Sequence, residues 1–141
     1  MGGKHFTTAC TISRNGHGVS LSALANTGAN GYIFINTRCA LDAAKFMNTT
    51  AVRLQQPLPV RGFNGQSGAP VTHAIILHMK VAGRRQKDQP MLIANLGQHD
   101  LIIGRKWLEE NDIWLDVRNR RMIWPDERPA DGPGLIRELV T

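Results

Sequence analysis

The sequence predicts a single all-β domain with one short helix. Short apolar segments rich in β-branched residues recur along the chain, and turns containing Gly and Asn separate them. Arg105–Asn111 has the composition of a short helix. With 141 residues, 42% of them hydrophobic, the chain can bury one core of moderate size.

We expect the folded domain to occupy residues 6–125. Residues 1–5 are expected to be a disordered or added segment. Residues 126–141 are expected to form a linker-like tail, because Pro, Gly and charged residues dominate after Pro125. No apolar run approaches the roughly 20 residues that cross a bilayer. The N-terminus lacks the apolar core of a signal peptide, so the default expectation is a cytosolic protein without membrane contact.

The first half of the chain predicts strands joined by tight turns. Asn15-Gly16 favours the positive φ angles of a hairpin loop, so the segments on either side should pair. Helix formers at Leu41–Met47 are typical of a helical turn. The strands expected here are Phe6–Ser13, Val19–Ala25 and Tyr32–Ile35.

The second half predicts a long hairpin and further strands. Val52–Val60 contains two prolines and is typical of an edge strand. Arg61–Gly68 has three glycines in eight residues, which favours a mobile hairpin tip, although an ordinary surface hairpin fits equally well. A polar turn is expected at Gly83–Asp88. The remaining expected strands are Val71–Val81, Pro90–Leu96, Leu101–Gly104, Ile113–Val117 and Arg121–Trp124.

The net charge of +6 and the pI of about 10.0 raise the question of nucleic-acid binding. Lys and Arg are spread along the chain, and the tightest group, Arg118, Arg120 and Arg121, lies at an expected hairpin turn. Aromatic and basic residues do not alternate as they do in single-strand binders. We therefore expect no direct nucleic-acid binding. A polyprotein that packages nucleic acid would account for the charge equally well.

The sequence predicts no metal site and no cofactor. Cys10 and Cys39 are expected to be reduced and buried, and two cysteines make no zinc pattern. His73 and His78 are an odd number of residues apart on an expected strand, which directs them to opposite faces. A Gly-x-Ser-x-Gly nucleophile motif is absent.

The most informative stretch is Ala23–Asn30. An apolar run reaches an Asn-Thr-Gly-Ala turn, and a β-rich segment leaves it. A polar residue at the end of a buried strand, followed by a small hydroxyl residue and Gly, suits a loop that presents one side chain to a cleft. An Asp at position 26 would make this the active-site loop of an aspartic protease. The chain has Asn26, and its first carboxylate is Asp42.

In motif order the chain resembles the retropepsins, the aspartic proteases of retroviruses and long-terminal-repeat retrotransposons. The resemblance covers about residues 6–125 and combines Asn26–Ala29, a Gly-rich hairpin, and Leu101–Arg105 before a helix. His99–Gly104 with Trp107-Leu108, and Arg121–Pro125, are most similar to Ty3/Gypsy-type elements.

The resemblance implies a closed acid-protease barrel whose active site forms in a two-fold homodimer. In that family each subunit supplies one Asp, and the two carboxylates share a proton and hold a water. The ionised carboxylate accepts a proton from the attacking water, and the protonated one stabilises the oxyanion. The expected substrate is an extended Gag-Pol polypeptide bound as an added strand. The expected location is cytoplasmic, within a virus-like particle.

The resemblance assigns roles to the matching positions. The catalytic positions are Asn26, in place of the Asp, with Thr27 and Gly28. Gly104 and Arg105 are structural. The substrate-binding positions are Ala29, Asn30, Ile33, Gly62, Phe63, Asn64, Gly65, Gln98, His99 and Ile103.

Two residues depart from the family pattern. Asn26 keeps the shape of a carboxylic acid but cannot act as a base. General-base catalysis contributes about 10²–10⁴-fold, so we expect peptide binding without cleavage. Asn30 stands where many relatives have an acid, so Arg105 is expected to hydrogen-bond this amide or main-chain carbonyls.

Two explanations of Asn26 remain open. A deliberate Asp-to-Asn replacement in an endopeptidase is favoured, because the other matching residues are intact and the Met-Gly-Gly start resembles an added one. The alternative is a natural pseudoprotease that acts as a dimeric peptide-binding module. A basic, nucleic-acid-associated β-barrel is a third interpretation.

Overall fold

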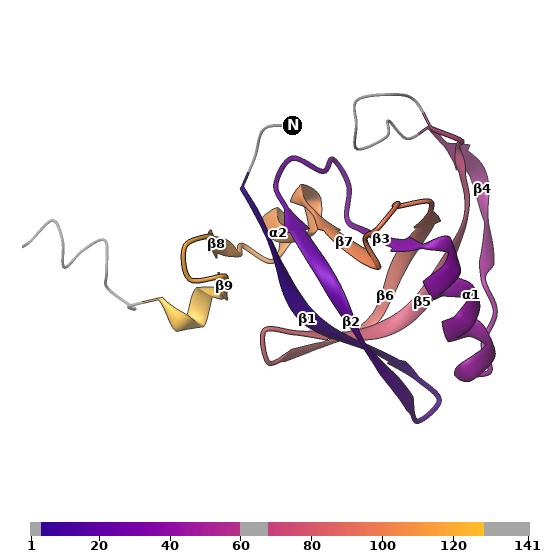
Figure 1. Cartoon of the computed structure of the whole chain (residues 1–141), viewed down its shortest axis with the longest axis horizontal. Helices are drawn as coiled ribbons and strands as arrows, with labels where there is room; N and C mark the ends of the chain where they lie inside the picture. The colour runs from indigo at the N-terminus through magenta and orange to yellow at the C-terminus, as the bar shows by residue number, and fades with distance from the viewer. Residues whose placement is uncertain (1–3, 60–67, 129–141) are drawn as a thin grey trace, which may run out of the picture.

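The computed structural model describes residues 4–59 and 68–128. A seven-stranded sheet in the order β1-β2-β7-β3-β6-β5-β4 forms its centre (Figure 1). The strands are β1 (His5–Arg14), β2 (His17–Asn26), β3 (Ile33–Asn36), β4 (Val52–Leu58), β5 (Val71–Val81), β6 (Arg84–Ala94), β7 (Leu101–Gly104), β8 (Trp114–Asp116) and β9 (Arg121–Ile123). The helices are α1 (Thr37–Phe46), α2 (Arg105–Glu110) and the 3-10 turn η1 (Pro125–Glu127).

The sheet closes into a six-stranded barrel because β1 pairs with both β2 and β5. Strand β4 joins the outside of β5 and lies at the edge of the sheet. The closed, mostly β architecture confirms the fold class predicted from the sequence.

The first hairpin brings the start of β1 beside the end of β2. Asn15 and Gly16 have φ angles of 53° and 81°, as a two-residue turn with the right-handed twist of the strands requires. From this turn the register runs without interruption to the pair His5↔Asn26. The predicted Asn-Gly hairpin is therefore confirmed.

Two sequence-based boundaries were wrong. Gly83–Asp88 is not a turn, because the chain reverses at Ala82 and Gly83, whose φ angles are 51° and 76°. β6 begins directly afterwards, and Arg84 pairs with Val81. The polar residues that suggested a loop lie on a largely exposed part of this strand, where charged side chains remain in water.

Helix α1 is longer than the predicted helical turn at Leu41–Met47 and begins four residues earlier, at Thr37. The apolar residues at 41–47 do not mark the start of the helix, because its first residues, Thr37 and Arg38, are polar. The helix buries Ala40 and Ala43 and packs against β3 and β6 at one side of the barrel (Figure 1).

The apolar side chains form two clusters. The larger fills the barrel and includes Ile12, Leu77 and Met91, none of which is exposed. The smaller cluster contains Ala29, Phe34, Leu96 and Ile102. Because side chains alternate along a strand, Ile102 belongs to this smaller cluster whereas both of its neighbours in β7 belong to the main core.

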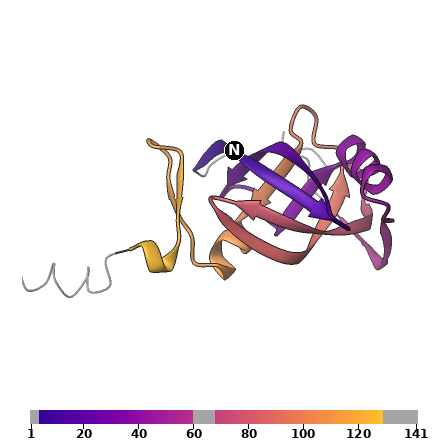
Figure 2. The same ribbon diagram turned by 90° about the horizontal axis from the view of Figure 1, so that it is seen from below.

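The β8–β9 hairpin projects beside the barrel (Figure 2). Trp124, just after β9, is buried and contacts Trp107 of α2 edge-to-face, with 5.8 Å between ring centroids. Arg84 of β6 donates to Asp126 at 2.7 Å. These contacts fasten the hairpin to the barrel. Within the described ranges, no helix is long and apolar enough to cross a membrane.

Candidate active site

Asn26 lies where two parallel strands end side by side. β2 pairs with β7 in parallel register, which places Asn26 opposite Gly104. Asn26 is 2% exposed and is the one buried polar residue within the described ranges. The sequence separates these two strand ends widely, and the barrel brings them together.

The loop after β2 fixes the orientation of the Asn26 amide. Gly28 N–H donates to Asn26 Oδ1 at 2.8 Å, and Ala29 N–H donates to the main-chain oxygen of Asn26 at 3.1 Å. Because Oδ1 accepts from Gly28, Nδ2 occupies the other position of the amide. Nδ2 donates to none of the described residues, and it is not among the fully buried polar atoms that lack a partner. The atom that Asn26 leaves for a ligand is therefore a donor.

Thr27 is held by the residue before β1. Thr27 N–H donates to the Lys4 carbonyl at 2.9 Å, and Lys4 N–H donates to Thr27 Oγ1 at 2.7 Å. These bonds extend the β1–β2 ladder by one residue and place Lys4 beside the loop.

A second set of bonds joins residues 29–32 to the start of α2. Gly104 N–H donates to the Tyr32 carbonyl at 2.7 Å, and Lys106 N–H donates to the Gly31 carbonyl at 2.9 Å. Arg105 N–H donates to the Ala29 carbonyl at 2.8 Å, and Arg105 Nη2 donates to Asn30 Oδ1 at 2.9 Å. The predicted hydrogen bond between Arg105 and Asn30 is confirmed, and the structural role of Arg105 stays a prediction.

Gly104 is required by the close approach of this loop. A Cβ at position 104 would lie 2.9 Å from the Gly31 carbonyl carbon and 3.0 Å from the Ala29 oxygen. Both are main-chain atoms that cannot move aside without shifting the loop. This closeness supports the structural role predicted for Gly104.

A solved structure with the same architecture is the retroviral protease-like domain of Ddi1 from Leishmania major. Its match has a TM-score of 0.59 and covers 86% of this chain and 89% of that chain, at 20% sequence identity. The chain has a retropepsin-like fold. No protein-family model matches the chain, and a search of curated proteins gives no match.

Within the retropepsin-like fold, the other predicted site residues differ in how far they are exposed. Ile33 and Ile103 pair across β3 and β7 and are 1% and 0% exposed. In the single chain they contact core side chains and offer no surface to a peptide. Gln98 is exposed and His99 is half-buried in a loop tied to Asn36, which donates through Nδ2 to the His99 carbonyl at 3.0 Å. Gly62, Phe63, Asn64 and Gly65 lie outside the described residues.

No sequence pattern assigned a role to Leu24 or to Ile102, which is 0% exposed and belongs to the smaller cluster. They occupy paired positions on β2 and β7, two residues before Asn26 and Gly104 respectively. Alternation along each strand therefore directs them to the same side of the sheet as Asn26. Leu24 is half-buried and packs against the smaller cluster. The period-two pattern counted back from Asn26 would have found it.

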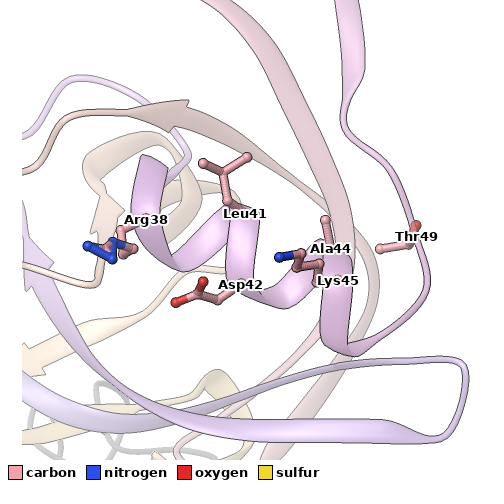
Figure 3. A pocket seen from close by; sticks show the side chains of 6 residues that line it. All are labelled: Arg38, Leu41, Asp42, Ala44, Lys45 and Thr49. Atoms are coloured by element: carbon pink, nitrogen blue, oxygen red, sulfur yellow. The ribbon is translucent and has the colours of Figure 1, made fainter.

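Two depressions lie away from the loop. One, of about 350 Å³, is lined by residues of β1 and β2 and by the residue just before β7: Thr7, Thr8, Ala9, Ser20, Leu21, Ser22 and Asp100. The other, of about 630 Å³, lies beside α1, and Arg38, Leu41, Asp42, Ala44, Lys45 and Thr49 line it (Figure 3). In the part of the chain that the structure describes, no three His, Cys, Asp or Glu residues are placed to hold a metal ion.

Proposed function

We propose that this chain is a retropepsin-type polypeptide-binding unit that, with Asn26, holds an extended peptide without cutting it. The supporting observation is the bond from Gly28 N–H to Asn26 Oδ1 at the meeting of β2 and β7. An Asp in the same position would keep one oxygen on Gly28 and present the other to the ligand. The same loop would then be an aspartic-protease site.

The proposed active unit is a homodimer. Each chain supplies one residue 26, so a site with two such side chains requires a second copy related by a two-fold axis. With Asp at position 26 of both chains, the two carboxyl groups would lie close together. Because two negative charges at that distance repel each other, the pair would share one proton. The ionised carboxylate would accept a proton from water as the water attacks the peptide carbonyl, and the protonated carboxyl would donate to the oxyanion. This step requires only the two side chains and water.

The proposed biological setting of a chain with Asp at this position is the maturation of a retrotransposon Gag-Pol polyprotein, in the cytoplasm and within a virus-like particle. The second candidate is a pseudoprotease that binds peptides in its natural state. Both candidates share the Nδ2 donor of Asn26, which can bind a carbonyl oxygen but cannot accept a proton.

The test is Asn26→Asp in the full 141-residue chain. We expect the variant to cleave members of an extended-peptide library at mildly acidic pH, and a pepstatin-type inhibitor to slow the cleavage. The parent chain should remain at background, about 10²–10⁴-fold lower. The matched control is Asn30→Asp, which adds a carboxylate to the same loop, next to Arg105, and should leave cleavage at background.

Two results would contradict the proposal. A folded Asn26→Asp dimer that cleaves no peptide would exclude the endopeptidase site. Sedimentation that shows only monomer at high protein concentration, for the parent and the variant alike, would exclude the two-fold active unit.

A further inference from the structure

Asn26 is 2% exposed, and the part of its amide that no described residue engages carries only hydrogen-bond donors. Oδ1 is used by Gly28 N–H, and Nδ2 carries two N–H groups with no acceptor among the described residues. A group that satisfies these donors must accept hydrogen bonds. Ionised acceptors form hydrogen bonds roughly twice as strong as neutral ones do.

Basic residues are bonded to both sides of the same loop. Lys4 is bonded to Thr27 through its main chain, and His5 pairs with Asn26. Arg105 and Lys106 are bonded to the other side of the loop, at Ala29 and Gly31. All four side chains are exposed. Arg105 donates to the neutral Asn30, and the ion pairs found in residues 4–59 and 68–128 include none of these four side chains.

The nearby carboxylates of Asp100 and Glu109 are not bonded to the Asn26 loop. Asp100 accepts from Ser22 N–H at 3.3 Å and from Cys39 Sγ at 3.6 Å. Ser22 precedes Asn26 by four residues in β2, or about 13 Å along the strand. Glu109 is one helical turn after Arg105 in α2 and lies in none of the ion pairs found in the described ranges. Among the residues that the structure describes, basic residues are bonded to the loop on both sides of Asn26, and no carboxylate is bonded to it.

We propose that the Asn26 site binds a carboxylate carried by an extended polypeptide. The carboxylate is either the free C-terminus of a chain or an Asp or Glu side chain, since both present the same two oxygens. This inference rests on the proposed peptide-binding function and specifies its ligand. An Asp at position 26 would reverse the preference, because it would place a negative charge against the ligand.

The test measures binding of labelled peptides to the full chain by fluorescence anisotropy at low salt. Three peptides share one extended sequence: one has a free C-terminal carboxylate, one a C-terminal amide, and one a C-terminal amide with an internal Asn replaced by Asp. We expect the carboxylate that the site recognises to increase affinity about tenfold over the fully amidated peptide. Comparing the first and third peptides identifies its source.

Variants of the chain test the role of Asn26 itself. Asn26→Asp and Asn26→Ala should each remove the preference for the carboxylate peptide, and the second does so without adding a charge. Lys106→Gln should weaken binding of the carboxylate peptide only. Lys45→Gln, beside α1 and away from the loop, is the matched control and should change nothing. Thermal melting confirms that each variant is folded.

The outcomes separate the two proposals. Equal affinity for the charged and amidated peptides would overturn the carboxylate inference and leave the proposed peptide-binding function standing. A carboxylate preference that persists in Asn26→Ala would also overturn the inference, because the donor would not be responsible. Binding of none of the peptides, together with no cleavage by Asn26→Asp, would overturn both.

Discussion

Gly104→Ala tests whether the close approach of Gly104 to residues 29–31 holds the site together. The added methyl group would lie 2.9 Å from the Gly31 carbonyl carbon and 3.0 Å from the Ala29 oxygen. Real Cβ atoms do not come so close to main-chain atoms, so the loop or the end of β7 must shift. The shift would strain the bonds that Gly104, Arg105 and Lys106 donate to this loop.

The expected cost follows from these contacts. Overpacking of this kind costs about 1–3 kcal/mol. Weakening three main-chain hydrogen bonds, each with a net contribution of about 0.5–1.5 kcal/mol, adds to this cost. The lower entropy of the unfolded chain returns about 0.4–1 kcal/mol. We expect Gly104→Ala to reduce the free energy of unfolding by about 3 kcal/mol.

Urea denaturation of the variant, monitored by tryptophan fluorescence, measures this change. The control is Gly18→Ala, because a Cβ at position 18 would meet its nearest atoms at 3.5–3.7 Å, which is ordinary van der Waals distance. Gly18→Ala should change the free energy of unfolding by less than about 1 kcal/mol. Equal effects of the two substitutions would refute the inference that the close approach at Gly104 constrains the loop.

Two further predictions concern titratable groups. A hydrogen bond from Arg14 lowers the pKa of Asp88 in the folded state. The ionised carboxylate therefore stabilises the folded state at pH values above the unfolded-state pKa of about 3.9. This contribution disappears as the pH falls through the lowered folded-state pKa. Asp88→Asn should therefore reduce the urea midpoint more at pH 7 than at pH 2, and an equal loss at both would contradict this origin. Burial raises the pKa of the Cys10 thiol to about 12 and that of Cys39 to about 11. Native Cys10 should thus react with a thiol reagent at pH 8 about a thousandfold more slowly than the unfolded chain, and fast labelling of Cys10 in the Cys39→Ser variant would exclude its burial.

Local sequence patterns predicted much of the barrel because local physics determines those elements. Asn15-Gly16 supplies the positive φ angles of its turn, and β-branched segments alternate as pleated strands require. The turn at Ala82-Gly83 was missed because Ala rarely takes a positive φ, whereas the polar residues that follow suggested a loop. An exposed strand accepts such residues, and only its pairing with β5 shows that it is a strand.

The individual residues of the site could be predicted from the sequence, but their arrangement in space could not. The Asn26–Ala29 turn and the glycine at the end of β7 could each be recognised locally. That Asn26 stands opposite Gly104 depends on parallel pairing between distant strands, which no local pattern specifies. The same pairing places Ile103 in the core, and it places Leu24 on the face of the sheet that carries Asn26. Neither placement was predicted from the sequence.

The shape of the loop does not depend on the acidity of residue 26. Main-chain donors and acceptors hold Thr27, Ala29 and Gly31, and the Asn26 side chain contributes one accepted bond through Oδ1, which a carboxylate oxygen could accept equally well. Exchange between Asn and Asp should therefore leave the loop in place and change only what its outward atom can do: the amide donates, and the carboxylate accepts. A single position would then decide whether the site holds an acceptor group or activates water, while the surrounding fold stays the same.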